Sequence, residues 1–557
     1  MIILSIHDGH NASAAILKDG VVISCVSEER INRKKFYWGW PYQSIDFVVQ
    51  EAGISGKDID VMTISHLSAV HYAIRKWSLL SSYKIWKPKA FIGHFLNMFD
   101  SFKKDLKVRK FKKSFCPQAK IFFCDHHLAH AASAYYFSGK SEALVVTCDA
   151  LGDTLSHTAY SVKYGKWKRL VRGDSPESLG TFYGAITEGL GFKPNQHEGK
   201  IVGLAAYASP DVLIDRMRKT LVWNTNGGMH FRRAPYKKMM QEIKVLVIEG
   251  FSKEEISSAA QALLEELMVS HVQVLLEKNP HTSLCLAGGV FANVKLNQRL
   301  VEKNKIEHIF IQPAMGDEGL VLGSALWYLN NTSEVKSART EQNPLEHVYF
   351  GTHTDNKTIE KILENKGRKY STLENSAEVV AGLVAEGSIV GIFDGKMEFG
   401  PRALGARTIV ADPRNKDVND ILNKRLKRSE FMPFAPSVIA EKADDIFNNV
   451  EPARHTAEFM TITFSAKAEW IDKVPAIVHI DGTARPQLVR KDRNANYYNL
   501  INEFYKKTGI PLLMNTSFNM HEEPIVSSPE DALRSLDVGA VDYILFNNLI
   551  LVKGSIE

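Results

Sequence analysis

Three histidines open a run of small apolar residues, HHLAHAASAYYFSG, at residues 126–139. The small residues and their spacing predict a buried helix, on which His126 and His130, four residues apart, share one face. Two imidazoles placed in this way can bind one metal ion. They can also be core or capping histidines beside Asp125, so this segment alone leaves both interpretations open.

The composition is that of a soluble globular protein with more than one domain. The chain has 557 residues, of which 45% are hydrophobic and 24% charged, and a single core seldom grows beyond about 250–300 residues. No apolar run reaches the roughly 18–20 residues that cross a bilayer. The N-terminal MIILSIHDGHNAS lacks the basic region and cleavage site of a signal peptide. We therefore expect a cytoplasmic protein without membrane insertion.

Five cysteines are scattered along the chain without CxxC pairs. Three of them, Cys25, Cys148 and Cys285, lie in apolar runs typical of strands. This distribution predicts buried thiols in a reducing compartment.

The net charge of +6 is modest and does not by itself indicate nucleic-acid binding. It is concentrated in Lys103–Lys113, KKDLKVRKFKK, which has seven basic residues and one acid. Such a run is either a solvated helical face on an inserted segment or a surface for an anionic partner, and its role stays open.

Two segments share one plan of strand, polar turn, strand, turn and strand. They are residues 1–30, MIILSIHDGHNASAAILKDGVVISCVSEER, and residues 143–172, ALVVTCDALGDTLSHTAYSVKYGKWKRLVR. In each, an acid or amide follows the first strand. The repeat resembles the start of each half of actin-like and sugar-kinase-like ATPases, where the two turns face each other across the nucleotide phosphates. We therefore expect a duplicated α/β domain.

Glycine turns that precede helices predict nucleotide binding in the same domain. They lie in SLCLAGGVFANVKLNQRL (residues 283–300) and QPAMGDEGLVLGSALWYL (residues 312–329). Glycine lets the backbone approach phosphate or adenosine, and a helix N-terminus favours the anion. The candidate nucleotide-binding residues are Gly288, Gly289, Asn293 and Gly316.

The polar segment at residues 331–345, NTSEVKSARTEQNPL, interrupts this pattern and predicts a domain junction. We expect a first domain over residues 1–345 and a second α/β domain over residues 346–557. The second domain has arginines on glycine-rich turns, as in GKMEFGPRALGARTIVADPR, where guanidinium groups can bind phosphate or carboxylate. Its IPLLMNTSFNMHEEPIV stretch ends a strand in polar groups and predicts the floor of a site, with a hydrogen-bonded turn as the alternative.

The whole chain resembles the O-carbamoyltransferases of the nodulation-protein and antibiotic-tailoring type, in which a Kae1-like domain is fused to a YrdC-like domain. The matching stretches, in order, are HHLAHAASAYYFSG, CDALGDT, HEGKIVGLAAY, AGGVFANVKLN, AMGDEGLVLGSAL, MEFGPRALGARTIVADPR, PFAPSV, DGTARPQ and NTSFNMHEEPIVSSPEDAL. GPRALGAR and NTSFN are highly specific. The resemblance implies an actin/sugar-kinase-like (Kae1-like) duplicated domain followed by a YrdC-like α/β domain. It also implies ATP-dependent transfer of a carbamoyl group from carbamoyl phosphate, through carbamoyl adenylate, to a hydroxyl of a small molecule or glycoside.

The resemblance assigns roles to individual residues. The implied ligands of an iron(II) ion are His126, His130, Asp149 and Asp317, and this donor set also suits manganese or zinc. His10 matches the histidine that takes the acceptor proton, with His7 as a rival, and Mg²⁺ is expected with ATP. The positions implied around carbamoyl phosphate and adenylate are Arg402, Arg407, Lys427, Arg485, Ser517 and Asn519.

A tRNA threonylcarbamoyladenosine synthase-like enzyme is the closest alternative, because both component folds recur in that pathway. The fused order, GPRALGAR and the modest charge argue against it, so we expect a small-molecule acceptor and no nucleic acid. A sugar kinase or an ATP-hydrolysing chaperone would explain the repeat but not the histidine pair or the arginine loops. The sequence leaves open the identity of the acceptor and whether the chain forms a homo-oligomer.

Overall fold

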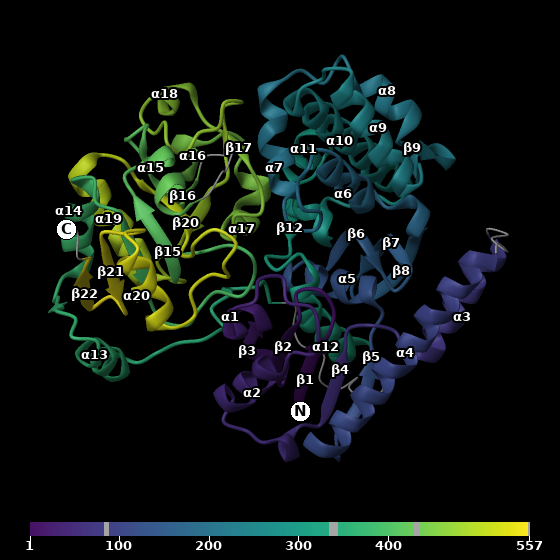
Figure 1. The fold of residues 1–557 in the computed structure, drawn as a ribbon, viewed down its shortest axis with the longest axis horizontal. Helices are drawn as coiled ribbons and strands as arrows, with labels where there is room; N and C mark the ends of the chain where they lie inside the picture. The colour runs from purple at the N-terminus through teal and green to yellow at the C-terminus, as the bar shows by residue number, and fades with distance from the viewer. Residues whose placement is uncertain (83–87, 333–342, 428–433, 555–557) are drawn as a thin grey trace.

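The computed structural model describes residues 1–82, 88–332, 343–427 and 434–554. Mixed α/β sheets form its framework (Figure 1). The first sheet has the strand order β3-β2-β1-β4-β5. Its strands are β1 (Ile2–His7), β2 (Ser13–Lys18), β3 (Val21–Ser27), β4 (Val61–Ile64) and β5 (Lys120–Phe123).

A second sheet repeats this plan in the order β8-β7-β6-β11-β12. Its strands are β6 (Glu142–Gly152), β7 (Leu155–Lys163), β8 (Lys166–Asp174), β11 (Ser283–Ala287) and β12 (His308–Ile311). In both sheets the first strand pairs antiparallel with the second and parallel with the fourth. The predicted duplication is confirmed.

Helices surround the two repeated sheets. They are α1 (Glu28–Asn32), α2 (Tyr42–Glu51), α3 (Ala69–Ser82), α4 (Pro88–Phe115), α5 (His126–Phe137), α6 (Leu179–Gly189), α7 (Glu198–Leu204), α8 (Ile214–Thr220), α9 (Tyr236–Ile248), α10 (Lys253–Lys278), α11 (Val294–Lys303) and α12 (Leu320–Asn331). A small ribbon of β9 (Val222–Thr225) and β10 (His230–Arg233) lies among them.

The helices α3 and α4 pack together and extend away from the sheets (Figure 1). The basic segment at residues 103–113 lies on α4. Within it Val108 is fully buried, and the Asp105 carboxylate accepts a hydrogen bond from the Ala69 backbone N–H at 3.0 Å. One face of the segment therefore packs on the protein, while most of its lysines stay exposed.

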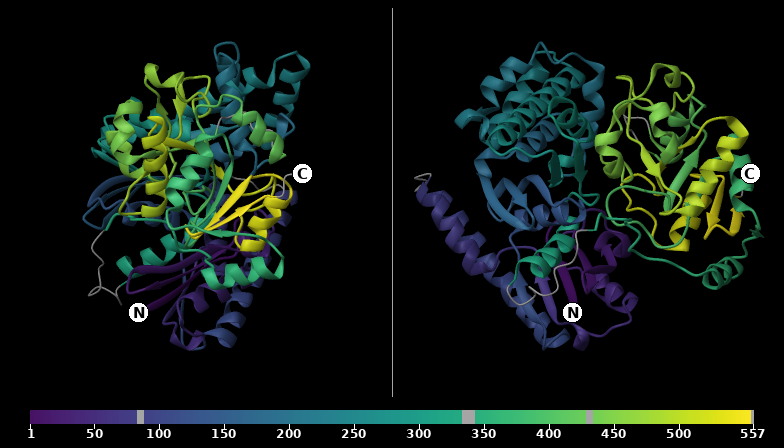
Figure 2. Two further views of the ribbon diagram at one scale, coloured as in Figure 1. Left: turned by 90° about the vertical axis from the view of Figure 1, so that its left-hand side faces the viewer. Right: turned by 180° about the vertical axis from the view of Figure 1, so that it is seen from behind.

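A third sheet lies to one side of the first two (Figure 2). Its strand order is β13-β22-β21-β14-β15-β20-β16-β19. The strands are β13 (Ser371–Thr372), β14 (Val390–Phe393), β15 (Arg407–Ala411), β16 (Ala435–Ile439), β19 (Gln487–Val489), β20 (Leu512–Ser517), β21 (Tyr543–Phe546) and β22 (Ile550–Lys553). The accompanying elements are α13 (Asn356–Asn365), α14 (Ser376–Ala385), α15 (Val418–Arg425), α16 (Ala443–Ile446), α17 (Arg454–Ala457), α18 (Ala468–Ile471), α19 (Ala495–Thr508), α20 (Pro529–Asp537), β17 (Phe464–Ser465) and β18 (Thr483–Ala484).

The α/β class is thus confirmed, whereas the YrdC-like character of the third-sheet region stays a prediction. The predicted junction at residues 331–345 falls mainly on residues 333–342, outside the described residues. The boundary between residues 345 and 346 stays a prediction as well. All five cysteines are buried free thiols, as predicted. Within the described ranges no helix has the length and apolarity to cross a membrane.

Two helices cross over between the repeated sheets. Helix α5 follows the first sheet in the chain but packs on β6 and β11 of the second, and α12 follows the second sheet but packs on β1 and β4 of the first. The buried hydroxyl of Ser324 on α12 lies 2.8 Å from that of Ser5 on β1. The crossover brings α5 and α12 into contact with each other.

Gly323 permits this contact. A Cβ atom at Gly323 would lie 1.7 Å from the backbone oxygen of Ala129 on α5 and 3.0 Å from the Ser133 nitrogen. Both neighbours are helix backbone and cannot rotate away as a flexible side chain could. The spacing of α5 and α12 therefore depends on a residue without a side chain.

We expect Gly323→Ala to lower the melting temperature, because overpacking a close contact costs about 1–3 kcal/mol. Gly382→Ala in α14 is a matched control, since a Cβ there meets no atom within 4 Å. Alanine favours helix over glycine by up to about 1 kcal/mol, so the control should be neutral or stabilising. Differential scanning calorimetry compares the two variants, and equal melting temperatures would contradict the proposed role of Gly323.

Candidate metal centre

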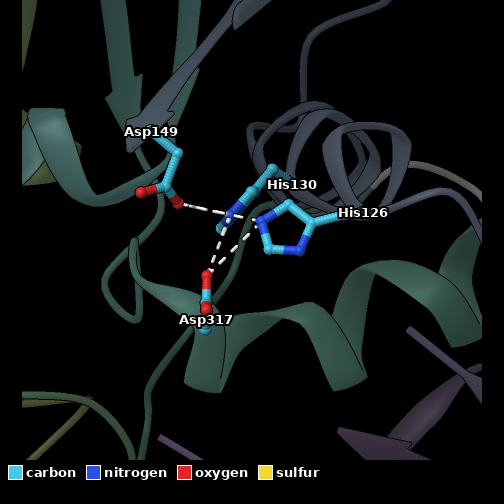
Figure 3. A group of neighbouring side chains, drawn as sticks. All are labelled: His126, His130, Asp149 and Asp317. Atoms are coloured by element: carbon cyan, nitrogen blue, oxygen red, sulfur yellow. Dashed lines mark hydrogen bonds and ion pairs between the residues drawn. The ribbon is translucent and has the colours of Figure 1, made fainter. Parts of the chain in front are cut away.

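The four predicted metal ligands come together from three separate elements. Helix α5 begins at His126 and is capped by Asp125, whose carboxylate accepts from the Leu128 backbone N–H at 2.9 Å. Asp149 lies in β6, and Asp317 lies in the short turn that leads into α12. Figure 3 shows the side chains of His126, His130, Asp149 and Asp317 converging on one point.

The donor atoms of this group all lie within 4.8 Å of one another. His130 Nε2 is 3.2 Å from Asp149 Oδ2 and 3.6 Å from Asp317 Oδ1. His126 Nε2 is 3.4 Å from Asp317 Oδ1 and 3.8 Å from Asp149 Oδ2. Ligand atoms around an ion at about 2.0–2.2 Å are separated by similar distances, so these residues fit one divalent cation.

The electrostatics of the group also suit a cation. Burial lowers the pKa of His126, but Asp317 and Asp149 outweigh it and raise that pKa to about 9. Burial raises the pKa of Asp149, yet hydrogen bonds with His126 and His130 hold it well below its usual range. Without an ion, protons on the imidazoles therefore neutralise the buried carboxylates.

Neighbouring groups fix the orientation of the histidines. The Asp153 carboxylate accepts from the backbone N–H of His126 at 3.0 Å and from that of Leu67 at 2.9 Å. A Cβ atom at Gly152 would lie 2.0 Å from the His126 ring, so the ring lies directly on glycine backbone. His127 instead bonds Thr147 Oγ1 at 2.8 Å, away from the cluster.

The two candidate bases occupy different positions. His7 is buried, and its Nε2 lies 3.9 Å from Asp317 Oδ2 and 3.0 Å from the backbone oxygen of His10. Burial lowers the pKa of His7 to about 4 despite nearby Asp317. The half-buried His10 ring stacks on Phe36, with 6.0 Å between the ring centroids. In the described part of the chain it makes no hydrogen bond or ion pair with the four ligands. The role of His10 stays a prediction.

Three of the four predicted nucleotide residues border the metal cluster. Gly288 has a positive φ of 107°, and a Cβ there would lie 2.2 Å from the Cys148 oxygen. A Cβ at Gly289 would lie 3.1 Å from Asp149 Oδ1, and one at Gly316 would lie 2.6 Å from Glu318 Oε2. Asn293 caps α11 by accepting from the Leu296 backbone N–H at 3.1 Å.

The six residues predicted around carbamoyl phosphate lie on several different elements. Arg407 and Ser517 lie on paired strands, β15 and β20, and the Ser517 hydroxyl donates to Asn519 Oδ1 at 2.5 Å. Lys427 is exposed after α15, and Arg485 follows β18. The structure thus brings together Arg407, Ser517 and Asn519.

Arg407 and Arg402 differ although they share one loop. The fully buried Arg407 guanidinium donates to the backbone oxygens of Asp394, Thr352, Gly395 and Ala406 and lies 3.5 Å from the Phe393 ring centroid. Arg402 points the other way, because its Nη2 donates to the Ala292 oxygen at 3.4 Å. Its buried Nε has no hydrogen-bond partner in the described part of the chain.

Two acids that the sequence predictions omit organise these loops. Glu398 Oε1 accepts from the backbone N–H groups of Leu404 and Arg407, at 2.6 and 3.2 Å. Glu318 is buried beside Asp317, and burial raises its pKa. Its Oε2 accepts a hydrogen bond from Asn11 Nδ2 at 3.4 Å. Its negative charge raises the pKa of Arg402 and so opposes the effect of burial. Glu318 lies in AMGDEGLVLGSAL and Glu398 in MEFGPRALGARTIVADPR, two of the stretches that carry the family resemblance. Their position in these stretches is the sequence signal that indicates them.

Comparison with known proteins defines the family. The model described as Carbamoyltransferase N-terminus matches residues 2–326, and that described as Carbamoyltransferase C-terminus matches residues 381–553. The chain belongs to the carbamoyltransferase family. It is therefore an enzyme of carbamoyl transfer, which favours the first of the predicted activities over the tRNA-modifying alternative.

Individual relatives agree with this membership along nearly the whole chain. An uncharacterized protein of Methanocaldococcus jannaschii is 32% identical and covers 99% of both chains. Nodulation protein NolNO of Sinorhizobium fredii is 32% identical over 98% of this chain and 79% of its own length. Nodulation protein U of Bradyrhizobium diazoefficiens is 26% identical over 98% of this chain and 96% of its own.

The protonation of His126 makes metal binding pH-dependent. Because its folded-state pKa of about 9 exceeds the ordinary 6.5, the proton stabilises the metal-free fold fully below pH 6.5, and this stabilisation is lost as the pH rises through 9. A divalent ion must displace that proton. The gain in melting temperature on adding Mn²⁺ should therefore be larger at pH 9 than at pH 6.5.

His130→Ala should remove this pH-dependent part of the gain. His308→Ala, at an exposed position at the start of β12, should retain it. Equal gains at both pH values in the unaltered protein would contradict a metal site at His126.

Proposed function

We propose that this carbamoyltransferase uses ATP and moves the carbamoyl group of carbamoyl phosphate to a hydroxyl of a small molecule or glycoside through carbamoyl adenylate. In the first step carbamoyl phosphate, ATP and water give carbamoyl adenylate, pyrophosphate and phosphate. In the second the acceptor oxygen attacks the carbamoyl carbon, AMP leaves, and the hydroxyl proton passes to a base.

The position of Arg402 carries this proposal. Arg402 belongs to the region that matches the carbamoyltransferase C-terminus, yet it reaches Ala292 on the glycine loop of the N-terminal region. Burial lowers its pKa only to about 10, so it is a cation at neutral pH. A cation with an unused Nε donor between the two regions can bind phosphate oxygens of a nucleotide shared by both steps.

The proposed adenylation step uses the loop of residues 398–407 and the end of β20. The Nη groups of Arg407 donate hydrogen bonds to four backbone oxygens, so we assign this residue to holding the loop in shape. Ser517 and Asn519 supply polar groups beside it. Because a mixed anhydride reacts with water, its formation and use in adjoining sites favour a water-excluding passage between them.

The proposed transfer step uses the metal centre. His126, His130, Asp149 and Asp317 would hold the ion, iron(II) by resemblance, with manganese or zinc also compatible with the donors. Such an ion supplies Lewis acidity toward a carbonyl or phosphoryl oxygen. Gly288, Gly289 and Gly316 let the backbone lie close to these ligands; we assign them to the nucleotide phosphates, and Mg²⁺ is expected with ATP. His10 is the proposed base for the acceptor hydroxyl.

The division of labour can be tested without knowing the acceptor. Ser517→Ala and Arg402→Ala should abolish exchange of pyrophosphate into ATP that depends on carbamoyl phosphate, because we assign both residues to the adenylation step. His130→Ala should retain exchange and lose transfer, assayed over a panel of amino sugars and glycosides. Ser209→Ala, at an exposed serine bonded to Asp211, is the control for both. Loss of exchange in His130→Ala together with its survival in Arg402→Ala would reverse the assignment.

The proton acceptor can be tested by comparing two histidines. His10→Asn should lower transfer at least tenfold while exchange stays close to that of the unaltered enzyme, because His10 lies outside the ligand cluster. His7→Asn should mainly weaken metal binding, since His7 faces Asp317. Full transfer in His10→Asn would move the role of base to another group.

A further inference from the structure

A second cluster of potential ligands lies apart from the metal centre. His157 on β7, Glu177 in the turn after β8 and His230 on β10 have donor atoms within 4.8 Å of one another. His230 Nδ1 lies 2.8 Å from Glu177 Oε2. Two imidazoles and a carboxylate form a ligand set typical of zinc. The three residues are separated by 20 and 53 positions in the chain, so no short motif indicates them.

The two clusters lie on opposite faces of the second sheet. His157 and Thr158 are consecutive in β7 and so point to opposite faces. Thr158 bonds Thr147, which bonds His127 on α5, at 2.7 and 2.8 Å. The His157 ring packs instead against Phe231 of β10, at 5.0 Å between centroids. The second cluster therefore cannot share an ion with the first.

His157 has a buried nitrogen that lacks a partner. His157 is only 1% exposed, and its Nε2 makes no hydrogen bond within the described residues. Nδ1 lies 3.2 Å from the Ser156 hydroxyl, whose own hydrogen goes to the Asp174 oxygen at 2.9 Å. The hydroxyl must then accept from Nδ1–H, which leaves a lone pair on Nε2. Burial also lowers the pKa of His157 well below its usual value, so the ring is neutral.

A core histidine bonded only through Nδ1 would leave Nε2 desolvated and unsatisfied, which carries a cost. A metal ion removes that cost, and fixing a ligand through its other ring nitrogen is the usual arrangement around protein metals. The pair His230–Glu177 is close enough that a small outward movement places both donors at the separation of about 3.3 Å expected around a tetrahedral ion. The His230 side chain is 31% exposed, which gives the ion access from solvent.

We propose that His157, Glu177 and His230 bind a second divalent cation of zinc type, with water in the remaining position. The ion cross-links β7, the turn at Ser175–Glu177 and β10, which are distant in sequence. It thereby anchors the β9–β10 ribbon to the second sheet. This site is independent of the proposed route of carbamoyl transfer.

Metal stoichiometry tests the proposal in the full-length protein. Metal-stripped protein is dialysed to equilibrium against Zn²⁺, and the zinc bound per chain is measured by inductively coupled plasma mass spectrometry. We expect about one ion per chain to remain in the His126→Ala/His130→Ala variant, and that ion to be lost when His230→Ala is added. His308→Ala in the same background is the control and should keep the ion. With Co²⁺ in place of Zn²⁺, the visible absorption of a four-coordinate ion should appear and disappear in the same pattern.

Glu177→Gln guards against a folding defect, because glutamine can still bond His230 but is a poor ligand. It should weaken Zn²⁺ binding at least tenfold while the metal-free melting temperature stays close to that of its parent. A His126→Ala/His130→Ala variant that binds no Zn²⁺ would overturn the proposal. Undiminished binding after His230→Ala or Glu177→Gln would also overturn it and leave His157 as a core histidine beside an ion pair.

Discussion

The contact between α5 and α12 is the constraint on which the candidate metal centre depends. Helix α5 supplies both histidines, and the turn before α12 supplies Asp317. A Cβ atom at Gly323 would lie 1.7 Å from the Ala129 oxygen, so any larger residue must separate the helices. A separation of even 1 Å is a large fraction of the 3.4 Å between His126 and Asp317. The spacing of the two helices therefore sets the distances between the metal ligands.

Because the same site is buried, its stability depends on whether its charges are paired. An unpaired carboxylate in the interior is costly, and it is tolerated only with a charged partner or a metal. In the metal-free protein the proton on His126 is that partner, and an ion replaces it. The energy of the fold and the affinity for the ion are thus linked through one set of atoms.

Much of the fold and of this centre could be predicted because the signals are local. A four-residue spacing places His126 and His130 on one face, and the repeat of strand and turn predicts a duplicated domain. The structure has two sheets of the same strand order. Local sequence patterns do not predict which groups a long side chain will contact. Arg402 and Arg407 stand five residues apart in one glycine-rich loop, yet one reaches the other region and the other is enclosed by backbone oxygens.

Long-range pairings escaped prediction for the same reason. His7 meets Asp317 only because β1 of one sheet faces the turn of the other. The group of His157, Glu177 and His230 depends on three elements whose spacing follows no motif. Glu398 binds backbone amides, and its own sequence neighbourhood gives no sign of which amides those are. Such contacts follow from topology and become visible only once the sheets are assembled.

The two matched regions are joined by arginines that bind backbone oxygens across the interface. Arg30 on α1 donates to the Gly400 oxygen at 3.0 Å, and Arg33, directly after α1, donates to the Ile525 and Pro524 oxygens at 2.6 and 2.8 Å. In return Arg402 donates to Ala292. Arg30 and Arg33 also form ion pairs with Glu29 and Asp531, at 2.9 and 3.4 Å, so hydrogen bonds and ion pairs together hold the two regions in one arrangement. On the proposed function, the Arg402 cation at this interface would attract a phosphate-bearing intermediate, which favours its passage between sites over its release.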